Sequence, residues 1–402
     1  MRSQLPLYFI LMTVVLDAMG IGLIMPVMPN LIQEVQAGGL ADAAVWGGVM
    51  AAVFAVMQFV FSPILGNLSD RFGRRPVLLI SMAALAVDYL IMALAGTLWW
   101  LLIGRVLGGI TSATHSTANA FVADISKPED RAARFGLISA AFGVGFLLGP
   151  MLGGALDMAF GWRSGFVLYA ALGLGLLALC WGDWGETNFQ RASTFGKQMQ
   201  SYPELLTSRR FWGYSLCMAF SIGGFYAFIT GAPLVAEAWF DLSPAILGLG
   251  IGIITGGFMV GNFVTGRLAQ RVSLNTLILA GRLSAILGPV AGLALFAAGL
   301  GHELVFFGAA ICVGFGNGLT VANASAGLMS VRPHLAGSAS GLSGALTVAV
   351  GAVMTTLTGI LVTPEAAPLI VLAIILGASL CAFAAILYVR WLDRVEPLEE
   401  PV

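Results

Sequence analysis

Long apolar runs separated by short polar segments dominate the sequence. Runs of 18 or more apolar residues recur along the whole chain, which is typical of helices that cross a bilayer. We predict twelve such spans, at residues 5–30, 44–66, 76–96, 98–120, 134–156, 163–184, 211–236, 244–266, 274–299, 303–329, 336–361 and 367–391. The expected fold is therefore an all-α polytopic membrane protein with twelve transmembrane helices.

The longest polar stretch begins at Glu186 and divides the twelve spans six and six. After the second span of each half lies a related hexapeptide, Gly66–Arg71 in the first half and Gly266–Arg271 in the second. Such an internal repeat is typical of a duplicated transporter with a substrate cavity between its halves. We predict two pseudo-symmetric six-helix bundles, at residues 1–185 and 210–402, joined by a cytoplasmic linker at 186–209.

Composition and charge support a membrane location. Hydrophobic residues make up 58% of the 402 residues and charged residues only 10%, too few to cover a soluble protein of this size. All but three of the 19 Lys and Arg residues fall in loops that are cytoplasmic if the N-terminus is. This asymmetry predicts that both termini are cytoplasmic. The resemblance described below implies that the membrane is a bacterial inner membrane. We expect the lipid bilayer as a partner, no nucleic acid, and a functional monomer.

The loop after the second span concentrates charge between two apolar runs. It matches the G-x-L-(small)-D-R-x-G-R-R signature and so resembles the major facilitator superfamily, through Gly66, Asp70, Arg71, Gly73, Arg74 and Arg75. The resemblance implies that Asp70 contacts the start of the eleventh helix, where unpaired N–H groups favour an anion. We expect the arginines to pair with carboxylates, above all Asp124 with Arg131 nearby, and the cluster to form a cytoplasmic gate. The alternative is that these cations only set the topology.

The fifth span repeats small residues at every fourth position. Gly145, Gly149 and Gly153 form a smooth helix face, Pro150 adds a bend and Gly154 follows. Ordinary small-residue packing would explain the pattern. It also resembles the signature of drug/proton antiporters, which sugar symporters lack.

Three charged residues of the first half lie well inside predicted spans, away from their ends. Asp17 is near the middle of the first, Asp88 near the middle of the third, and Arg105 is in the fourth. A carboxylate in hydrocarbon is costly unless it is protonated, paired or facing water, so such residues are usually functional. We predict that these three couple transport to protons. The alternative is a structural role.

Polar and aromatic residues inside the spans are candidates for the substrate cavity. Seven-residue spacing places Arg105, Ser112 and Asn119 on one helical face, with His115 beside it. In the second half Arg282 is the only ionisable residue well inside a span. The complete set of candidates is Gln58, Ser112, His115, Asn119, Phe225, Tyr226, Arg282, Asn317 and Asn323. Helix packing and interhelical hydrogen bonding are the competing explanations.

The two halves resemble different exporters. The first half is similar to the bacterial tetracycline/proton antiporters at residues 16–27, 57–58, 68–79, 88–90, 104–105 and 123–124. By that resemblance Asp17 and Asp88 match acids important for exchange. The second half resembles the Bcr/CflA drug exporters at residues 211–240 and 336–342. Where tetracycline pumps carry an aspartate in the ninth span, this chain has Arg282, which favours neutral or anionic substrates.

The sequence thus predicts a proton-coupled exporter of small amphipathic drugs or metabolites, working by alternating access. A symporter of metabolites or sugars is one rival, although the glycine-proline signature speaks against it. A non-transporting membrane sensor is another. We expect no enzyme activity, cofactor or metal, because no nucleophile–base pair, metal cluster or phosphate loop is evident.

Overall fold

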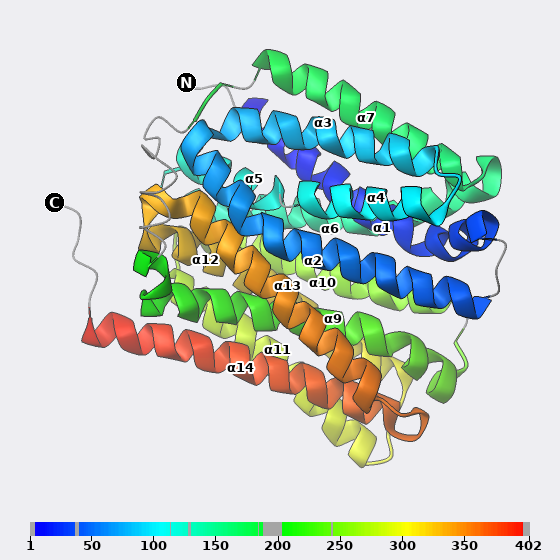
Figure 1. Cartoon of the computed structure of the whole chain (residues 1–402). Coiled ribbons are helices and arrows are strands. Elements are labelled where there is room, and N and C mark those ends of the chain that lie inside the picture. The colour runs from blue at the N-terminus through cyan, green and yellow to red at the C-terminus, as the bar shows by residue number, and fades with distance from the viewer. Residues whose placement is uncertain are drawn as a thin grey trace. The chain divides into compact units, whose positions relative to one another are not determined.

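The computed structural model describes residues 5–36, 40–112, 114–127, 130–183, 185–187, 203–242 and 244–396. Helices account for nearly all of them (Figure 1). In the first half of the chain these are α1 (Leu5–Gln36), α2 (Leu40–Phe72), α3 (Arg74–Ala93), α4 (Leu98–Thr111), α5 (Thr114–Ile125), α6 (Arg131–Phe160) and α7 (Trp162–Asp183). In the second half they are α9 (Arg209–Phe240), α10 (Pro244–Leu268), α11 (Leu274–Ala297), α12 (Glu303–Val331), α13 (Ala336–Leu361) and α14 (Ala367–Val395).

Ten segments in the described part of the chain are long and apolar enough to cross a membrane. They correspond to every predicted span except the first and the fourth. In α1 the qualifying apolar stretch is the shorter Leu7–Gly20.

The structure describes the predicted fourth span as two helices. Helix α4 ends at Thr111, and α5 begins at Thr114. The hydroxyls of Thr111 and Ser112 donate to the carbonyls of Gly108 and Gly109. These side chains therefore compete with backbone N–H groups for the carbonyls of the last helical turn, in a glycine-rich segment. Arg105, Ser112 and Asn119 therefore do not share one uninterrupted helical face.

Local chemistry sets several other helix ends. Gly73, with φ of 105°, separates α2 from α3 by a left-handed step that favours glycine. The Ser208 and Ser273 hydroxyls accept hydrogen bonds from Phe211 N–H and Thr276 N–H and so cap α9 and α11.

The chain forms two compact units. The first contains Met1–Ile125, Ala141–Gln198 and His334–Ala345, and the second contains Ser126–Ala140, Met199–Pro333 and Leu346–Val402. Two helices, α6 and α13, thus contribute their first turns to one unit and the remainder to the other. The predicted boundaries at 185 and 210 stay predictions.

Helix packing inside the two units repeats. In the first unit α2 packs on α4, α3 on α4 and α3 on α7. In the second unit the pairs six spans further on also pack together, α10 on α12, α11 on α12 and α11 on α14. The same partnership recurring at a six-span offset is the arrangement of a duplicated bundle and agrees with the repeated hexapeptide.

Candidate functional site

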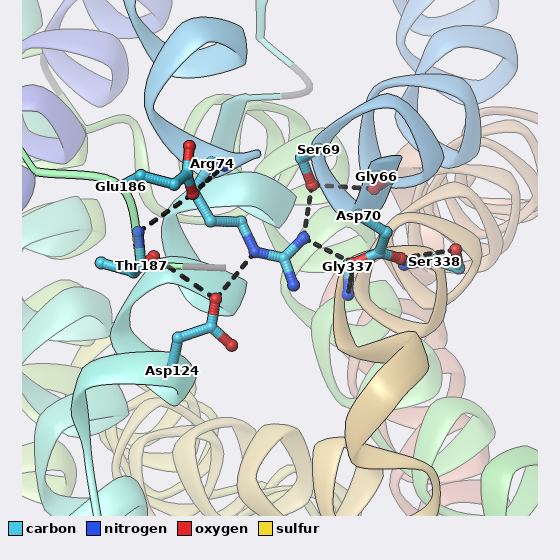
Figure 2. A network of polar contacts seen from close by, with 9 residues as sticks. All are labelled: Gly66, Ser69, Asp70, Arg74, Asp124, Glu186, Thr187, Gly337 and Ser338. Atoms are coloured by element: carbon cyan, nitrogen blue, oxygen red, sulfur yellow. Dashed lines mark hydrogen bonds and ion pairs between the residues drawn. The ribbon is translucent and has the colours of Figure 1, made fainter. Parts of the chain in front are cut away.

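The guanidinium of Arg74 is the centre of a polar network in the first unit (Figure 2). Its Nη1 donates to Asp70 and, at 2.7 Å, to the hydroxyl of Ser69. Its Nε donates to Asp124 Oδ2 at 3.0 Å. Arg74 is only 2% exposed, so its charge is balanced by two carboxylates in place of water.

Asp70 connects this network to the first turn of α13. Its carboxylate accepts from Gly337 N–H at 3.1 Å and from Ser338 N–H at 2.8 Å, and the Ser338 hydroxyl donates to it at 2.8 Å. An anion at a helix N-terminus satisfies unpaired N–H groups and complements the helix dipole. The contact expected from the sequence is therefore present. Its role as a gate stays a prediction.

Small residues allow α2 and α13 to approach backbone to backbone. A Cβ on Gly66 would overlap the carbonyl oxygen of Gly337, and a Cβ on Gly341 would overlap that of Ser62. Gly66 thus has a steric role one helical turn before Asp70, because it brings the α13 amide groups within reach of the carboxylate.

The other motif cations behave differently from expectation. Arg74 pairs with Asp70 and Asp124, but Arg71 and Arg75 make no ion pair with a described carboxylate. Arg75 donates to the Trp181 carbonyl at 2.8 Å, and Arg71 lies over the ring of Phe72. Arg71 and Arg75 thus lie at helix ends, outside the ion-pair network of Arg74.

Neighbouring acidic groups complete the network around Arg74. Glu186 accepts from the Arg74 backbone N–H at 2.9 Å. Burial raises the pKa of Asp124 above its usual range, and the charge of Arg74 opposes that shift. Arg131 begins α6 in the part of the chain assigned to the second unit.

The intramembrane charges of the first unit form a second cluster. Asp17 and Asp88 are both buried, and Asp88 is an electrostatic neighbour of Arg105. The Asp88 carboxylate lies against the helix face formed by Gly104 and Gly108 of α4. No direct ion pair joins the described side chains of Asp88 and Arg105, whose guanidinium sits 5.5 Å from the ring centre of Phe54.

Tyr89 links the two acids and was missed by sequence reasoning. It is buried and is an electrostatic neighbour of Asp17, Asp88 and Arg105. Its hydroxyl occupies the space left by the absent side chain of Gly20, one turn after Asp17. The only signal was its position beside Asp88, because aromatic residues in spans are usually packing.

The glycine face of the fifth span supports the helix that carries Asp17. A Cβ on Gly145 would overlap the Val15 carbonyl oxygen, and one on Gly153 would lie 3.0 Å from the Leu23 carbonyl oxygen. Gly149 is buried, while the surroundings of Pro150 and Gly154 lie outside the described set. The motif therefore packs α6 against α1 on both sides of the acid.

We predict that Gly145→Ala displaces α1 and sharply reduces transport, because a methyl group there meets backbone that cannot rotate away. Overpacking of this kind costs about 1–3 kcal/mol, visible as a lower Tm of the purified protein. Gly175→Ala is the matched control, since a Cβ at Gly175 meets nothing within 4 Å. Equal transport by both variants would show that the α1–α6 contact is not required.

Arg105→Lys should retain less than half of the transport activity. A flexible ammonium does not reproduce the planar guanidinium beside Asp88 and over Phe54. Initial rates in membrane vesicles, normalised to protein amount, measure the effect. Full activity in Arg105→Ala would exclude the predicted role.

The remaining candidates of the first unit are spread over several helices. Gln58 is half-buried in α2, and Asn119 is buried in α5. Ser112 is buried too, but its hydroxyl is used by its own helix. The side chain of His115 lies outside the described set. A role for these residues in binding substrate stays a prediction.

The second unit holds a different polar centre around Arg282. Its Nε donates to Thr320 Oγ1 at 2.8 Å and its Nη2 to Asn317 Oδ1 at 2.7 Å. The Asn317 amide donates in turn to the Ser221 carbonyl of α9 at 2.9 Å. Asn323 does not join these contacts, because its amide donates to the Thr265 hydroxyl of α10 at 3.3 Å.

The two aromatic candidates on α9 occupy unlike environments. Phe225 is partly buried and packs against the apolar core around Phe228 and Phe306. Tyr226 is 41% exposed and lies over Gly351 of α13. The two rings nevertheless form an edge-to-face pair with centroids 6.4 Å apart. A role in binding an aromatic ligand stays a prediction.

The chain belongs to the Major Facilitator Superfamily, whose sequence pattern matches residues 10–356. The fold agrees: the human organic anion transporter TETRAN superimposes with a TM-score of 0.73 at 21% identity, covering 95% of this chain and 98% of that one. The Escherichia coli fucose:proton symporter gives 0.76 at 15% identity, covering 96% and 98%. At such identities the superpositions describe the fold alone.

Sequence relatives are considerably more similar. The class H tetracycline resistance protein of Pasteurella multocida is 35% identical over 76% of each chain. The class C protein of Escherichia coli is 50% identical over 45% of each chain, so that match spans less than half of the relative. Multidrug resistance protein 1 of Bacillus subtilis is 34% identical over 44% of this chain and 46% of that one.

Proposed function

We propose that the protein is a proton-coupled exporter of amphipathic drugs or metabolites. The observation that carries this proposal is its similarity, over three quarters of each chain, to a tetracycline resistance protein. The buried cluster of Asp17, Asp88, Tyr89 and Arg105 supports it, because it supplies ionisable groups inside the spans. In this proposal the protein lies in a bacterial inner membrane, as its similarity to bacterial resistance proteins suggests. The charge asymmetry supports cytoplasmic termini.

In this proposal the halves at residues 1–185 and 210–402 alternate access to a shared substrate site. The Asp17 cluster binds a proton from the outside and releases it inside as the protein switches. The network of Arg74 and Asp70 stabilises the state closed to the cytoplasm. Each part corresponds to a separate set of residues and can be tested by itself.

Export is tested by expressing the chain in an efflux-deficient bacterium and measuring susceptibility to a chemically broad panel. We expect protection against neutral amphipaths such as phenicols, and weak or no protection against tetracycline, because Arg282 would repel a cationic metal–tetracycline complex. A protonophore should abolish the protection by removing the driving force.

The panel also separates the alternatives. Strong tetracycline resistance without phenicol protection would refute the substrate preference while preserving the exporter. Unchanged susceptibility to every compound, with the protein present in the membrane, would contradict drug export.

A further inference from the structure

Among the described residues of the second unit, the buried cation Arg282 has no carboxylate partner. Arg282 is 0% exposed, and both of its hydrogen-bond acceptors, Thr320 and Asn317, are neutral. Its remaining terminal nitrogen, Nη1, is also buried and has no acceptor among the described residues. A guanidinium does not lose its proton in a protein, so this charge persists.

No acidic residue of the second half lies close to Arg282 in the sequence. From residue 210 onward, every Asp and Glu lies near a helix end or beyond the last helix, at Glu237, Asp241, Glu303, Glu365, Asp393, Glu396, Glu399 and Glu400. Arg282 instead lies well inside α11. An isolated charge in such a position is strongly destabilising unless a counter-charge joins it.

The side chains around the guanidinium hold it in a fixed orientation. Asn317 is anchored to the Ser221 carbonyl of α9, which directs its side-chain oxygen at Arg282. Thr320 donates its own proton to the Gly316 carbonyl at 2.8 Å and therefore presents a lone pair to Arg282. With two nitrogens tied to neutral acceptors, Nη1 is left to meet an anion.

The face of α9 that borders Arg282 continues to an aromatic residue one helical turn beyond Ser221. Cys217, Ser221 and Phe225 are spaced by four residues and so share one face of α9. Cys217 is an electrostatic neighbour of Arg282, and Ser221 is bonded to Asn317. The face that borders the charge thus continues to the partly buried ring of Phe225.

We infer that Arg282, oriented by Asn317 and Thr320, is the subsite for an anionic group of the transported molecule, and that the preferred substrates are aromatic amphipaths carrying a carboxylate. This inference rests on the proposed export function and specifies its substrate class. The anion supplies the missing counter-charge, and the aromatic part packs on the face of α9 that carries Phe225.

Matched probes test the subsite on purified full-length protein in detergent. 2-Naphthoate and 2-naphthamide share the same ring and differ in charge, and isothermal titration measures their affinities. Wild type should bind naphthoate at least about tenfold more tightly, as expected for hydrogen bonds to a charged group. Equal affinities for the two probes would overturn the inference without any mutation.

Variants then assign the preference to Arg282. Arg282→Gln should bind both probes equally, and Arg282→Lys should retain part of the preference, because the charge remains but the fork is lost. Arg390→Gln, which removes an exposed cation of α14, should keep the full preference. A preference that survives in Arg282→Gln would exclude this residue as its source. A third outcome is that wild type binds both probes equally, while Asp17→Asn or Asp88→Asn prefers naphthoate. This would show that the chain supplies its own counter-charge to Arg282, and it would overturn the inference.

Failure of the subsite and failure of the export function give different results. If neutral drugs are exported but the probes bind with equal affinity, only the anionic subsite is wrong. If no amphipath is exported by cells that contain the protein, the export function is wrong, and a substrate subsite is overturned with it.

Discussion

Asp17→Asn should abolish proton-driven accumulation of substrate against a gradient. Asp17 is 9% exposed, and neither a hydrogen bond nor an ion pair joins it to another described side chain. A buried carboxyl group of this kind can take up and release a proton, whereas an amide of the same shape cannot. The variant should still bind substrate and exchange it down a gradient, because the α1–α6 packing at Gly145 is unchanged.

The decisive measurement is proton release induced by substrate in purified wild type and variant. Asp88→Asn is the matched control and should do less damage, since one acid suffices as the carrier. If Asp17→Asn releases protons like wild type and Asp88→Asn does not, the two assignments are reversed. If both behave as wild type, the proton is carried elsewhere, with His115 as the next candidate.

Asp70→Asn should reduce export by at least about tenfold while leaving the protein in the membrane. The carboxylate accepts hydrogen bonds from Gly337, Ser338 and Arg74, and hydrogen bonds to a charged group contribute about 1.5–3 kcal/mol each. An amide has one acceptor oxygen and no charge, so it satisfies only part of this set and leaves Arg74 with one carboxylate partner, Asp124.

Transport and membrane abundance are measured in the same vesicles, with Glu204→Gln as the control. Glu204 carries an exposed carboxylate 3.8 Å from Arg332, and such surface pairs contribute little. Wild-type export by Asp70→Asn would mean that the charged loop only sets the topology.

The helical fold was predictable from a strong local signal, and the Asp70 contact was predictable from the family resemblance of its motif. Apolar runs long enough to span a bilayer leave few alternatives to a helix, since lipid cannot satisfy free backbone groups. Asp70 sits in a ten-residue motif at a span end, and a carboxylate there needs donors. A helix N-terminus supplies them, as Gly337 and Ser338 do.

The details that were not predictable depend on which neighbour a side chain meets. The hydropathy of the fourth span gave no sign of the helix end near Ser112. A hydroxyl that bonds a carbonyl of its own helix does not change the pattern of apolar residues. Tyr89 has the sequence appearance of a packing residue, and only the gap at Gly20 places its hydroxyl near Asp17. Asn317 and Asn323 were both candidates for the substrate cavity, yet they bond to different helices, which the sequence cannot reveal.

The division of α13 between the two units has a consequence for biogenesis. The ribosome makes Asp70 long before its partner Gly337, which follows 267 residues later. Until then, a newly inserted first unit lacks the donors for that carboxylate and the backbone that fits against Gly66. Completion of this unit is therefore a late, post-insertional step that depends on the eleventh span. A fragment that stops before residue 334 should be a substrate for membrane quality control, even though it contains the first six spans intact.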